Sequence, residues 1–229
     1  MSVALGSPVV HDDGVKSSAE AAGEARPRRR RDRHDIRDQL IESAIAEFGA
    51  RGFDGASTRA IAARVHAHQP QIHYYFETND QLWRACVEHL FARQLEAMEG
   101  IEEAGSQAAI FAERIRRLVR FSARHPELNQ IILHEATWPS DRTAWLTDTY
   151  LRPRFEGVER EWEQLKANGV AVPVSSDVIY HALLGAVALR YVTAAETRAL
   201  LGDAALEPAG VEAHAEEVVT LFLPGLASQ

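Results

Sequence analysis

The segment from Thr58 to Phe76 constrains the fold of this chain more than any other part of its sequence. Its pattern predicts two short helices joined by a tight turn. Pro70 falls in the first turn of the second helix, where its missing N–H removes no hydrogen bond. The second helix would present a polar and aromatic surface that fits a DNA groove, made of His68, Gln69, Gln71, His73 and Tyr74.

An amphipathic helix is predicted directly before this segment, from about His34 to Arg51. Gly52 stands where that helix should end, because glycine adopts a left-handed C-terminal conformation without steric cost. Ser57 or Thr58 can cap the next helix by accepting from its free N–H groups. One apolar stripe recurs at helical spacing, formed by Ile36, Leu40, Ile41, Ala44, Ile45 and Phe48. Three helices that share one small core are therefore expected.

Charge is distributed unevenly along the 229 residues. The net charge is −8, which by itself argues against a nucleic acid partner. Residues 26–78, however, carry ten Arg and seven acidic residues, whereas the part from Asn79 onward is strongly acidic. A basic head on an acidic body keeps the body away from phosphates and orients the approach to DNA.

Residues 1–32 are predicted to form a disordered, arginine-rich arm, since residues 1–25 mix Ser, Gly, Ala and acids without a period. The arm is expected to enter the minor groove or to lie along the phosphate backbone, through Arg28, Arg29, Arg30 and Arg31. A solvated charge run that adds only salt-dependent affinity is the alternative.

The remaining chain predicts only helices. Apolar residues recur at helical spacing, with no strand alternation, in segments near 79–100, 108–125, 126–135, 142–168, 177–193 and 211–223. Pro153 falls inside the fourth of these and should kink or interrupt it. We predict an all-α fold with a helix-turn-helix head over residues 33–93 and a helical ligand-binding and dimerisation body over residues 94–229.

The last two predicted helices favour a dimer. Gly185 and Ala188 give the first of them a small-residue surface that another helix can approach closely. Two such amphipathic helices are typical of an intersubunit four-helix bundle. We therefore expect a homodimer through the last two helices, with packing inside one monomer as the alternative.

The segment from Ile36 to about Arg93 resembles the DNA-binding domain of TetR-type (tetracycline-repressor-like) transcriptional regulators. The resemblance is carried, without a gap in spacing, by Phe48-x-x-x-Gly52, Thr58, Ile61-Ala62, Tyr74-Tyr75-Phe76 and Leu82. It implies a helix-turn-helix head, followed by helices that form a ligand and dimer domain. The residues that it implies at the DNA surface are Thr58, Arg59, His68, Gln69, Gln71, His73, Tyr74, Tyr75 and Asn79.

Physical chemistry supports roles for these residues. Thr58 and Arg59 at a helix N-terminus can bind phosphate through free N–H groups and a side chain. Gln69 and Gln71 can reach base edges, and glutamine can pair bidentately with adenine. His73 and Tyr74 can touch bases or phosphates. Tyr75 can be partly buried or contact a phosphate.

Four positions depart from the family pattern. His66 stands where the family usually has glycine in the turn, and a non-glycine residue at positive φ costs about 1 kcal/mol. His68 and His73 replace the usual Ser or Thr and the usual Tyr. Asn79 replaces a basic residue that typically meets a phosphate, a loss for which the arginine arm can compensate.

Aromatic and polar-tipped residues in the body predict a ligand cavity. Such side chains between helices can line an apolar space with a few hydrogen-bonding groups. The candidates are Phe121, His134, Trp138, Trp145, Tyr150 and His181. Ordinary core packing remains the alternative for each of them.

Other chemistries lack a motif. Cys86 is the only cysteine, which fits a reducing compartment and weakens any zinc site, so no metal and no cofactor are expected. No nucleophile motif or phosphate loop is present, so an enzyme is not expected. No apolar run is long enough to span a membrane, and a cytoplasmic location follows.

The sequence thus predicts a homodimeric, sequence-specific DNA-binding regulator of transcription. The resemblance implies that it is a repressor, released from double-stranded operator DNA by a small apolar effector. A helical small-molecule-binding protein with weakened or lost DNA binding is the alternative, motivated by His66, His68 and Asn79.

Overall fold

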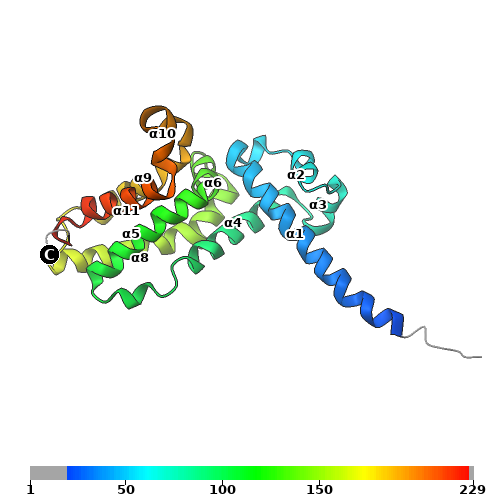
Figure 1. Ribbon diagram of the computed structural model, residues 1–229, viewed down its shortest axis with the longest axis horizontal. Helices are drawn as coiled ribbons and strands as arrows, with labels where there is room; N and C mark the ends of the chain where they lie inside the picture. The colour runs from blue at the N-terminus through cyan, green and yellow to red at the C-terminus, as the bar shows by residue number, and fades with distance from the viewer. Residues whose placement is uncertain (1–19, 227–229) are drawn as a thin grey trace, which may run out of the picture. The chain divides into compact units, whose positions relative to one another are not determined.

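The computed structural model describes residues 20–226, and the side chains of residues 36–102 and 105–225. Within that range the regular structure is entirely helical, as the sequence predicts (Figure 1). The chain divides into two compact units, residues 1–38 and residues 39–229. The functional surfaces described below all lie in the second unit.

Helix α1 (Glu20–Gly55) begins well before the predicted start near His34. The backbone of residues 20–32, predicted as part of a disordered arm, is helical. Ala, Glu and Arg dominate this stretch and have high helix propensity, which outweighs its charge density. The regular helix breaks at Gly52, where φ is 68°, so the predicted role of this glycine is confirmed.

Three further helices complete the head: α2 (Thr58–Arg64), α3 (Gln69–Tyr75) and α4 (Asn79–Glu96). The Ser57 hydroxyl caps α2 by accepting from the Ala60 N–H at 3.3 Å. Pro70 stands in the first turn of α3, as predicted. The shared core is built from buried apolar side chains, including Leu40, Ile45, Phe48, Ile61, Ile72, Phe76 and Leu82.

A buried carboxylate joins α1 to the start of α2. Glu47 is 1% exposed, and it accepts from the Arg64 guanidinium at 2.8 Å and from the Ser57 N–H at 3.3 Å. Arg51, one turn later in α1, lies 3.2 Å from the same carboxylate. Charged partners and a backbone donor together offset the cost of burying this group. Glu47 therefore fixes α2 on α1.

Seven α-helices follow, with short helical segments between them. They are η1 (Ile101–Ala104), α5 (Gln107–Arg124), α6 (Pro126–Ala136), α7 (Asp141–Leu146), η2 (Thr147–Leu151), α8 (Arg152–Ala167), α9 (Ser176–Val192), α10 (Ala194–Leu201), η3 (Asp203–Leu206), α11 (Pro208–Phe222) and η4 (Pro224–Leu226). Helix α10 was not predicted. The body core lies among α5, α8, α9 and α11, around Phe111, Ile115, Trp162, Leu183 and Ala215.

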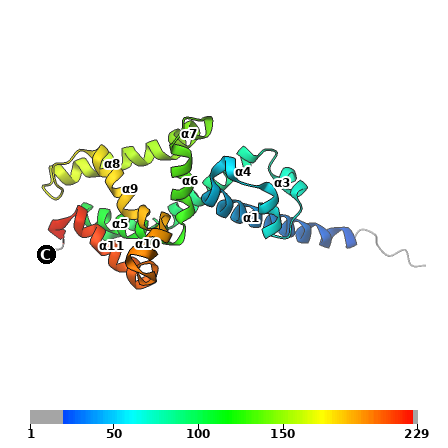
Figure 2. The same cartoon turned by 90° about the horizontal axis from the view of Figure 1, so that it is seen from above.

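The predicted long helix over residues 142–168 is interrupted. Helix α7 passes into the π-helical segment η2, and α8 begins immediately afterwards with Pro153 in its first turn. Proline has no N–H to donate and its ring crowds the preceding turn, so a widened turn accommodates it. The predicted effect of Pro153 is confirmed, and Figure 2 shows α7 and α8 in succession.

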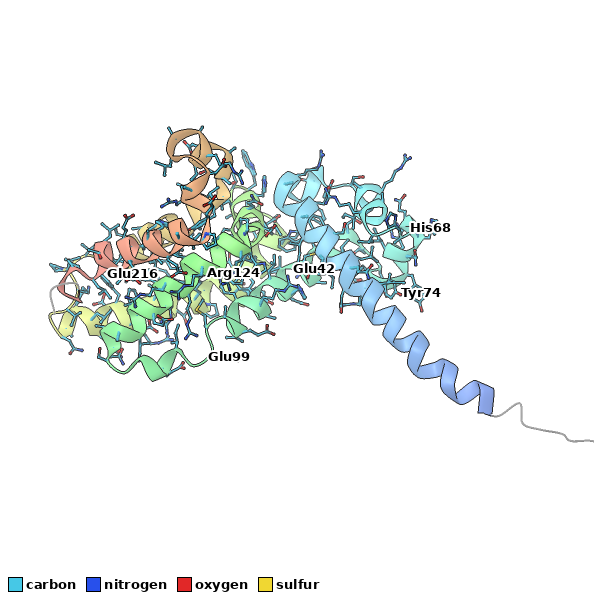
Figure 3. All side chains as sticks on the ribbon, in the orientation of Figure 1. Glu42, His68, Tyr74, Glu99, Arg124 and Glu216 are labelled. Carbon is cyan, nitrogen blue, oxygen red and sulfur yellow. The ribbon has the colours of Figure 1, made fainter. Side chains whose placement is uncertain are left out.

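Helices α5 and α11 pack side by side in the shared core, and ion pairs join their exposed edges. Arg116 pairs with Glu216 at 2.7 Å, and Arg120 pairs with Glu212 at 2.7 Å. Figure 3 labels Glu216 on α11, which runs alongside α5. None of the described helices is by itself long and apolar enough to cross a membrane, although α9 and α10, bent by 80°, pass that test together.

We predict that Glu47→Gln lowers the free energy of unfolding by about 1–3 kcal/mol, because Arg64 loses a charged hydrogen-bond partner in a buried site. The midpoint of urea denaturation measures this change. Glu156→Gln, at an exposed position of α8, is the matched control and should change stability by less than about 0.5 kcal/mol. Equal effects of the two substitutions would contradict the role given to Glu47.

Candidate nucleic-acid interface and ligand cavity

Helix α3 and its flanks form a polar and aromatic surface on the head. Figure 3 shows His68 and Tyr74 at its outer edge, and the Tyr74 side chain is 64% exposed. The other exposed residues among those predicted to contact DNA are Arg59, Gln69, His73 and Asn79. Thr58, Gln71 and Tyr75 are half-buried. Tyr75 packs edge-on against Tyr74, with ring centroids 5.0 Å apart. Of its two predicted roles, partial burial is therefore observed.

Both glutamines predicted to read bases are engaged in hydrogen bonds within the protein. Gln69 Nε2 donates to Thr58 Oγ1 at 3.0 Å, which links the first turns of α2 and α3. Gln71 Oε1 accepts from the His68 N–H at 2.7 Å and thereby caps α3. A bidentate pair with adenine needs the oxygen and the nitrogen of one amide. Gln71 in this arrangement can offer only its nitrogen, whereas Gln69 keeps its oxygen.

The turn between α2 and α3 contains His66 at φ 53°. It is the one non-glycine residue with positive φ in the part of the chain that the structure describes. The turn is closed by the Ala67 N–H, which donates to the Ala62 carbonyl at 2.9 Å. The left-handed conformation inferred from the sequence is therefore present, and the turn carries the strain that it implies.

The side chains of Arg28, Arg29, Arg30 and Arg31 lie outside the described residues. Their predicted contact with DNA stays a prediction.

A cavity of about 580 Å³ lies between α4, α5, α8 and α9. Most of its wall is apolar, with contributions from Phe91, Leu95, Met98, Phe111, Ile115, Leu118, Leu183 and Val187. Of the six residues predicted to bind a ligand, Tyr150 lines this cavity. Its ring stacks on Phe91 with centroids 4.0 Å apart.

The other five predicted ligand residues do not line the cavity. Phe121 packs against His125 and borders a separate arginine-rich hollow, and His134 and Trp138 border another hollow beside Gly49. Trp145 contacts Trp83 and Tyr150 instead. His181 is exposed, and its ring lies 2.8 Å from the Asp177 carbonyl. Residue type alone identified aromatic side chains, but it could not assign the face of the helix on which each one lies.

The aromatic pattern of the sequence does not predict the polar groups of the cavity, above all Arg154. This residue shares a face of α8 with the buried Val158 and Leu165, at helical spacing. An arginine at the helical spacing of an apolar stripe is the feature of the sequence that indicates a partly buried charge here. Arg154 Nη1 donates to Gln94 Oε1 on α4 at 3.3 Å, and burial lowers the pKa of its guanidinium.

Aromatic contacts lead from the cavity to helix α4 of the head. Trp145 lies between Tyr150 at 5.6 Å and Trp83 at 5.8 Å, measured between ring centroids. The Arg84 guanidinium stands 4.6 Å from the Trp145 ring. These side chains form a continuous packed path from the cavity wall into the core of the head.

A second link joins α7 to the end of α1. The Arg142 guanidinium lies 3.6 Å from the centre of the Phe53 ring, which follows the break at Gly52 near the end of α1. Its Nε donates to the buried Glu135 carboxylate of α6 at 3.1 Å. A guanidinium held by a carboxylate and stacked on an aromatic ring has little freedom to reorient. Arg142 thus fixes the body to the head.

No group of three or more His, Cys, Asp or Glu side chains that could hold a metal ion occurs among the described residues. The wall of the cavity likewise contains no histidine or cysteine.

Comparison with known proteins identifies relatives of the head. Residues 40–86 match the family model described as bacterial regulatory proteins, tetR family. The HTH-type transcriptional repressor NicS of Pseudomonas putida is 28% identical over 101 residues, which is 43% of this chain and 47% of that protein. The protein named Probable HTH-type transcriptional regulator YttP, of Bacillus subtilis, is 30% identical over 119 residues, 50% of this chain and 57% of that protein. The chain thus matches about half the length of these curated relatives.

Solved structures extend the likeness to the body. The crystal structure of AibR in complex with isovaleryl coenzyme A and operator DNA has a TM-score of 0.68 and 19% identity. That match covers 82% of this chain and 98% of that one. At this identity the likeness shows the fold. It confirms the predicted all-α arrangement of a helix-turn-helix head followed by a helical body.

We predict that His66→Gly raises the free energy of unfolding by up to about 1 kcal/mol, because glycine accepts a positive φ without steric cost. The gain is net of the entropy that glycine adds to the unfolded chain. Urea denaturation of the full chain measures it. His73→Gly, an exposed position inside α3, is the control and should lower stability by roughly 0.5–1 kcal/mol. A loss of stability in both variants would show that the turn is not strained.

Proposed function

We propose, from the premise that residues 40–86 belong to the tetR family of bacterial regulatory proteins, that this chain is a homodimeric repressor of transcription released from operator DNA by an effector. The observation that carries the proposal is the surface of α3, where His68, Gln69, His73 and Tyr74 are exposed together. The name of the relative NicS, a transcriptional repressor, supports the same function. Contact with chromosomal DNA implies a cytoplasmic location.

In this proposal the head contacts DNA in two ways. Arg59 and the start of α2 bind phosphates, which supplies affinity that depends on salt but not on sequence. Gln69, His73 and Tyr74 face the base edges in the major groove, where each base pair presents a distinct pattern of donors and acceptors. Asn79 is uncharged, so it contributes less to phosphate binding than the basic residue usual at this position.

A dimer would present two such heads to two half-sites. Exposed apolar side chains on α9 and α11 support the last two long helices as the interface: Val178 is 52%, Leu189 52% and Leu221 71% exposed. A Cβ added at Gly185 meets no atom within 4 Å, so this surface of α9 is open to a second helix. Half-sites one turn of DNA apart, about 34–36 Å, would then be read together.

The effector would act through the cavity. Helix α4 belongs to the core of the head through Trp83 and lines the cavity through Phe91. A ligand that displaces the Tyr150 ring would press on Trp145 and hence on Trp83. The ligand shifts the equilibrium between the DNA-bound and DNA-free conformations only if it binds the DNA-free conformation more tightly.

A second candidate is a small-molecule-binding protein whose head has weak affinity for DNA. The hydrogen bonds that occupy Gln69 and Gln71 favour it, since each must be exchanged or retained when bases are contacted. Such exchanges cost about 1 kcal/mol each, which is small beside the affinity of a specific site. The repressor is therefore the better supported of the two.

Binding of the full-length protein to DNA from upstream of its own gene tests the proposal. We expect specific retention, with Arg59→Ala lowering the salt dependence of binding by about one phosphate contact for each head. Gln69→Ala should reduce discrimination against unrelated DNA, at about 1–3 kcal/mol for each base pair read.

Two exposed residues of α8 give matched controls, Arg160→Ala and Gln164→Ala. Neither should alter binding. Equal affinity for upstream and unrelated DNA would contradict the repressor and favour the second candidate.

A further inference from the structure

The cavity contains one guanidinium without a carboxylate partner. Arg154 extends from α8 into the cavity wall, and its hydrogen-bond partner among the described residues is the neutral amide oxygen of Gln94, at 3.3 Å. Gln94 is 9% exposed and Arg154 is half-buried, so the hydrogen bond between them lies at the wall of the cavity and not on the open surface. No carboxylate oxygen of a described residue approaches the Arg154 guanidinium within 4.0 Å.

The second arginine that lines the cavity has a carboxylate partner. Arg114 on α5 forms an ion pair with Glu161 on α8, so its charge is compensated within the protein. Glu161 also lines the cavity, and the pair together contributes no net charge to it. Arg114 therefore needs no charged ligand.

The remaining titratable groups of the cavity do not neutralise Arg154. Tyr150 and Tyr180 line the cavity with phenol rings and bring no carboxylate to it, and burial raises the pKa of Tyr150. Glu88 is exposed on α4 and lies close enough to Tyr150 to contribute to that shift. It forms no ion pair with Arg154 in the described part of the chain.

An uncompensated guanidinium is costly in an apolar site. Moving a charge away from water without a partner of opposite charge is unfavourable, and the lowered pKa of Arg154 has the same cause. Arginine stays protonated even so, and its fork of donors matches a carboxylate bidentately. A carboxylate that enters with its own apolar body would satisfy Arg154 and the apolar wall at once.

We propose that this cavity binds an amphiphilic carboxylate, with the carboxylate on Arg154 and the apolar body against Phe91, Phe111, Ile115, Leu183 and Val187. The volume of about 580 Å³ lies within the range of ligand cavities and admits a medium-length acyl chain. The inference rests on the proposed function only in making this molecule the effector. Binding itself requires no DNA.

Calorimetric titration of the full-length protein with three probes of one chain length tests the proposal. We expect dodecanoate to bind at least 10-fold more tightly than dodecan-1-ol, which lacks the charge, and more tightly than dodecylamine, which is repelled by Arg154. Equal affinities for dodecanoate and the alcohol, or tighter binding of the amine, would overturn it.

Variants locate the contact. Arg154→Gln should weaken dodecanoate at least 10-fold and leave the alcohol unchanged, while Arg154→Lys keeps the charge and retains most of the affinity. Arg160→Gln, exposed on the same helix, is the control and should bind as the unaltered protein does. Undiminished binding of dodecanoate by Arg154→Gln would overturn the assignment. If that variant does not fold, the three probes on the unaltered protein decide.

Failure of this inference is distinguishable from failure of the proposed function. Dodecanoate that binds as expected to a protein without specific DNA affinity would leave the cavity assignment intact and contradict the repressor. Specific DNA binding by a protein that does not bind dodecanoate would contradict only the assignment of the cavity.

Discussion

The arrangement of the functional surfaces depends on the missing N–H of Pro153. Proline cannot continue the hydrogen-bond ladder of α7, so the chain widens into the π-helical segment Thr147–Leu151 before α8 begins. Side chains before and after this break contact different parts of the protein. Arg142 and Trp145 contact the head through Phe53 and Trp83, whereas Tyr150 and Arg154 line the cavity. One interrupted helix thus carries both residues that line the cavity and residues that contact the head.

The head has a tightly packed core and a surface with a strained turn and exposed hydrogen bonds. Its helices are fixed by a shared apolar core and by the buried Glu47 carboxylate. The surface of α3, for which we propose DNA contact, in contrast contains the positive φ of His66 and the exposed hydrogen bonds of Gln69 and Gln71. Strain and replaceable contacts at a recognition surface are tolerable when the scaffold beneath them is rigid.

Much of the head could be predicted from the sequence because local signals agree with the packing. Gly52, Ser57 and Pro70 stand at helix ends for steric and hydrogen-bonding reasons that do not depend on distant residues. The strained turn could also be foreseen, since His66 occupies a position for which glycine is suited. The early start of α1 differs from the prediction because the helix propensity of Ala, Glu and Arg outweighs the charge density of residues 20–32.

The cavity was much harder to predict. Whether an aromatic side chain lines a cavity or fills a core depends on which helices meet, and apolar periodicity does not give that information. Of the six predicted residues Tyr150 lines the cavity, while Phe121, His134, Trp138, Trp145 and His181 lie elsewhere. Arg154, the group with the clearest chemical consequence, was visible only as a cation in the apolar register of α8. Its lack of a carboxylate partner is a property of the folded chain.

We propose that the cavity and the DNA-contacting surface of the head are coupled through Trp145. The most direct test is the affinity of the full-length protein for its upstream DNA, with and without saturating dodecanoate, in the unaltered chain and in Trp145→Leu. We expect dodecanoate to weaken DNA binding about 10-fold, or about 1.4 kcal/mol of coupling, in the unaltered protein and much less in the variant. The DNA affinity without ligand should be similar in both proteins. An identical effect of dodecanoate on both would contradict coupling through Trp145.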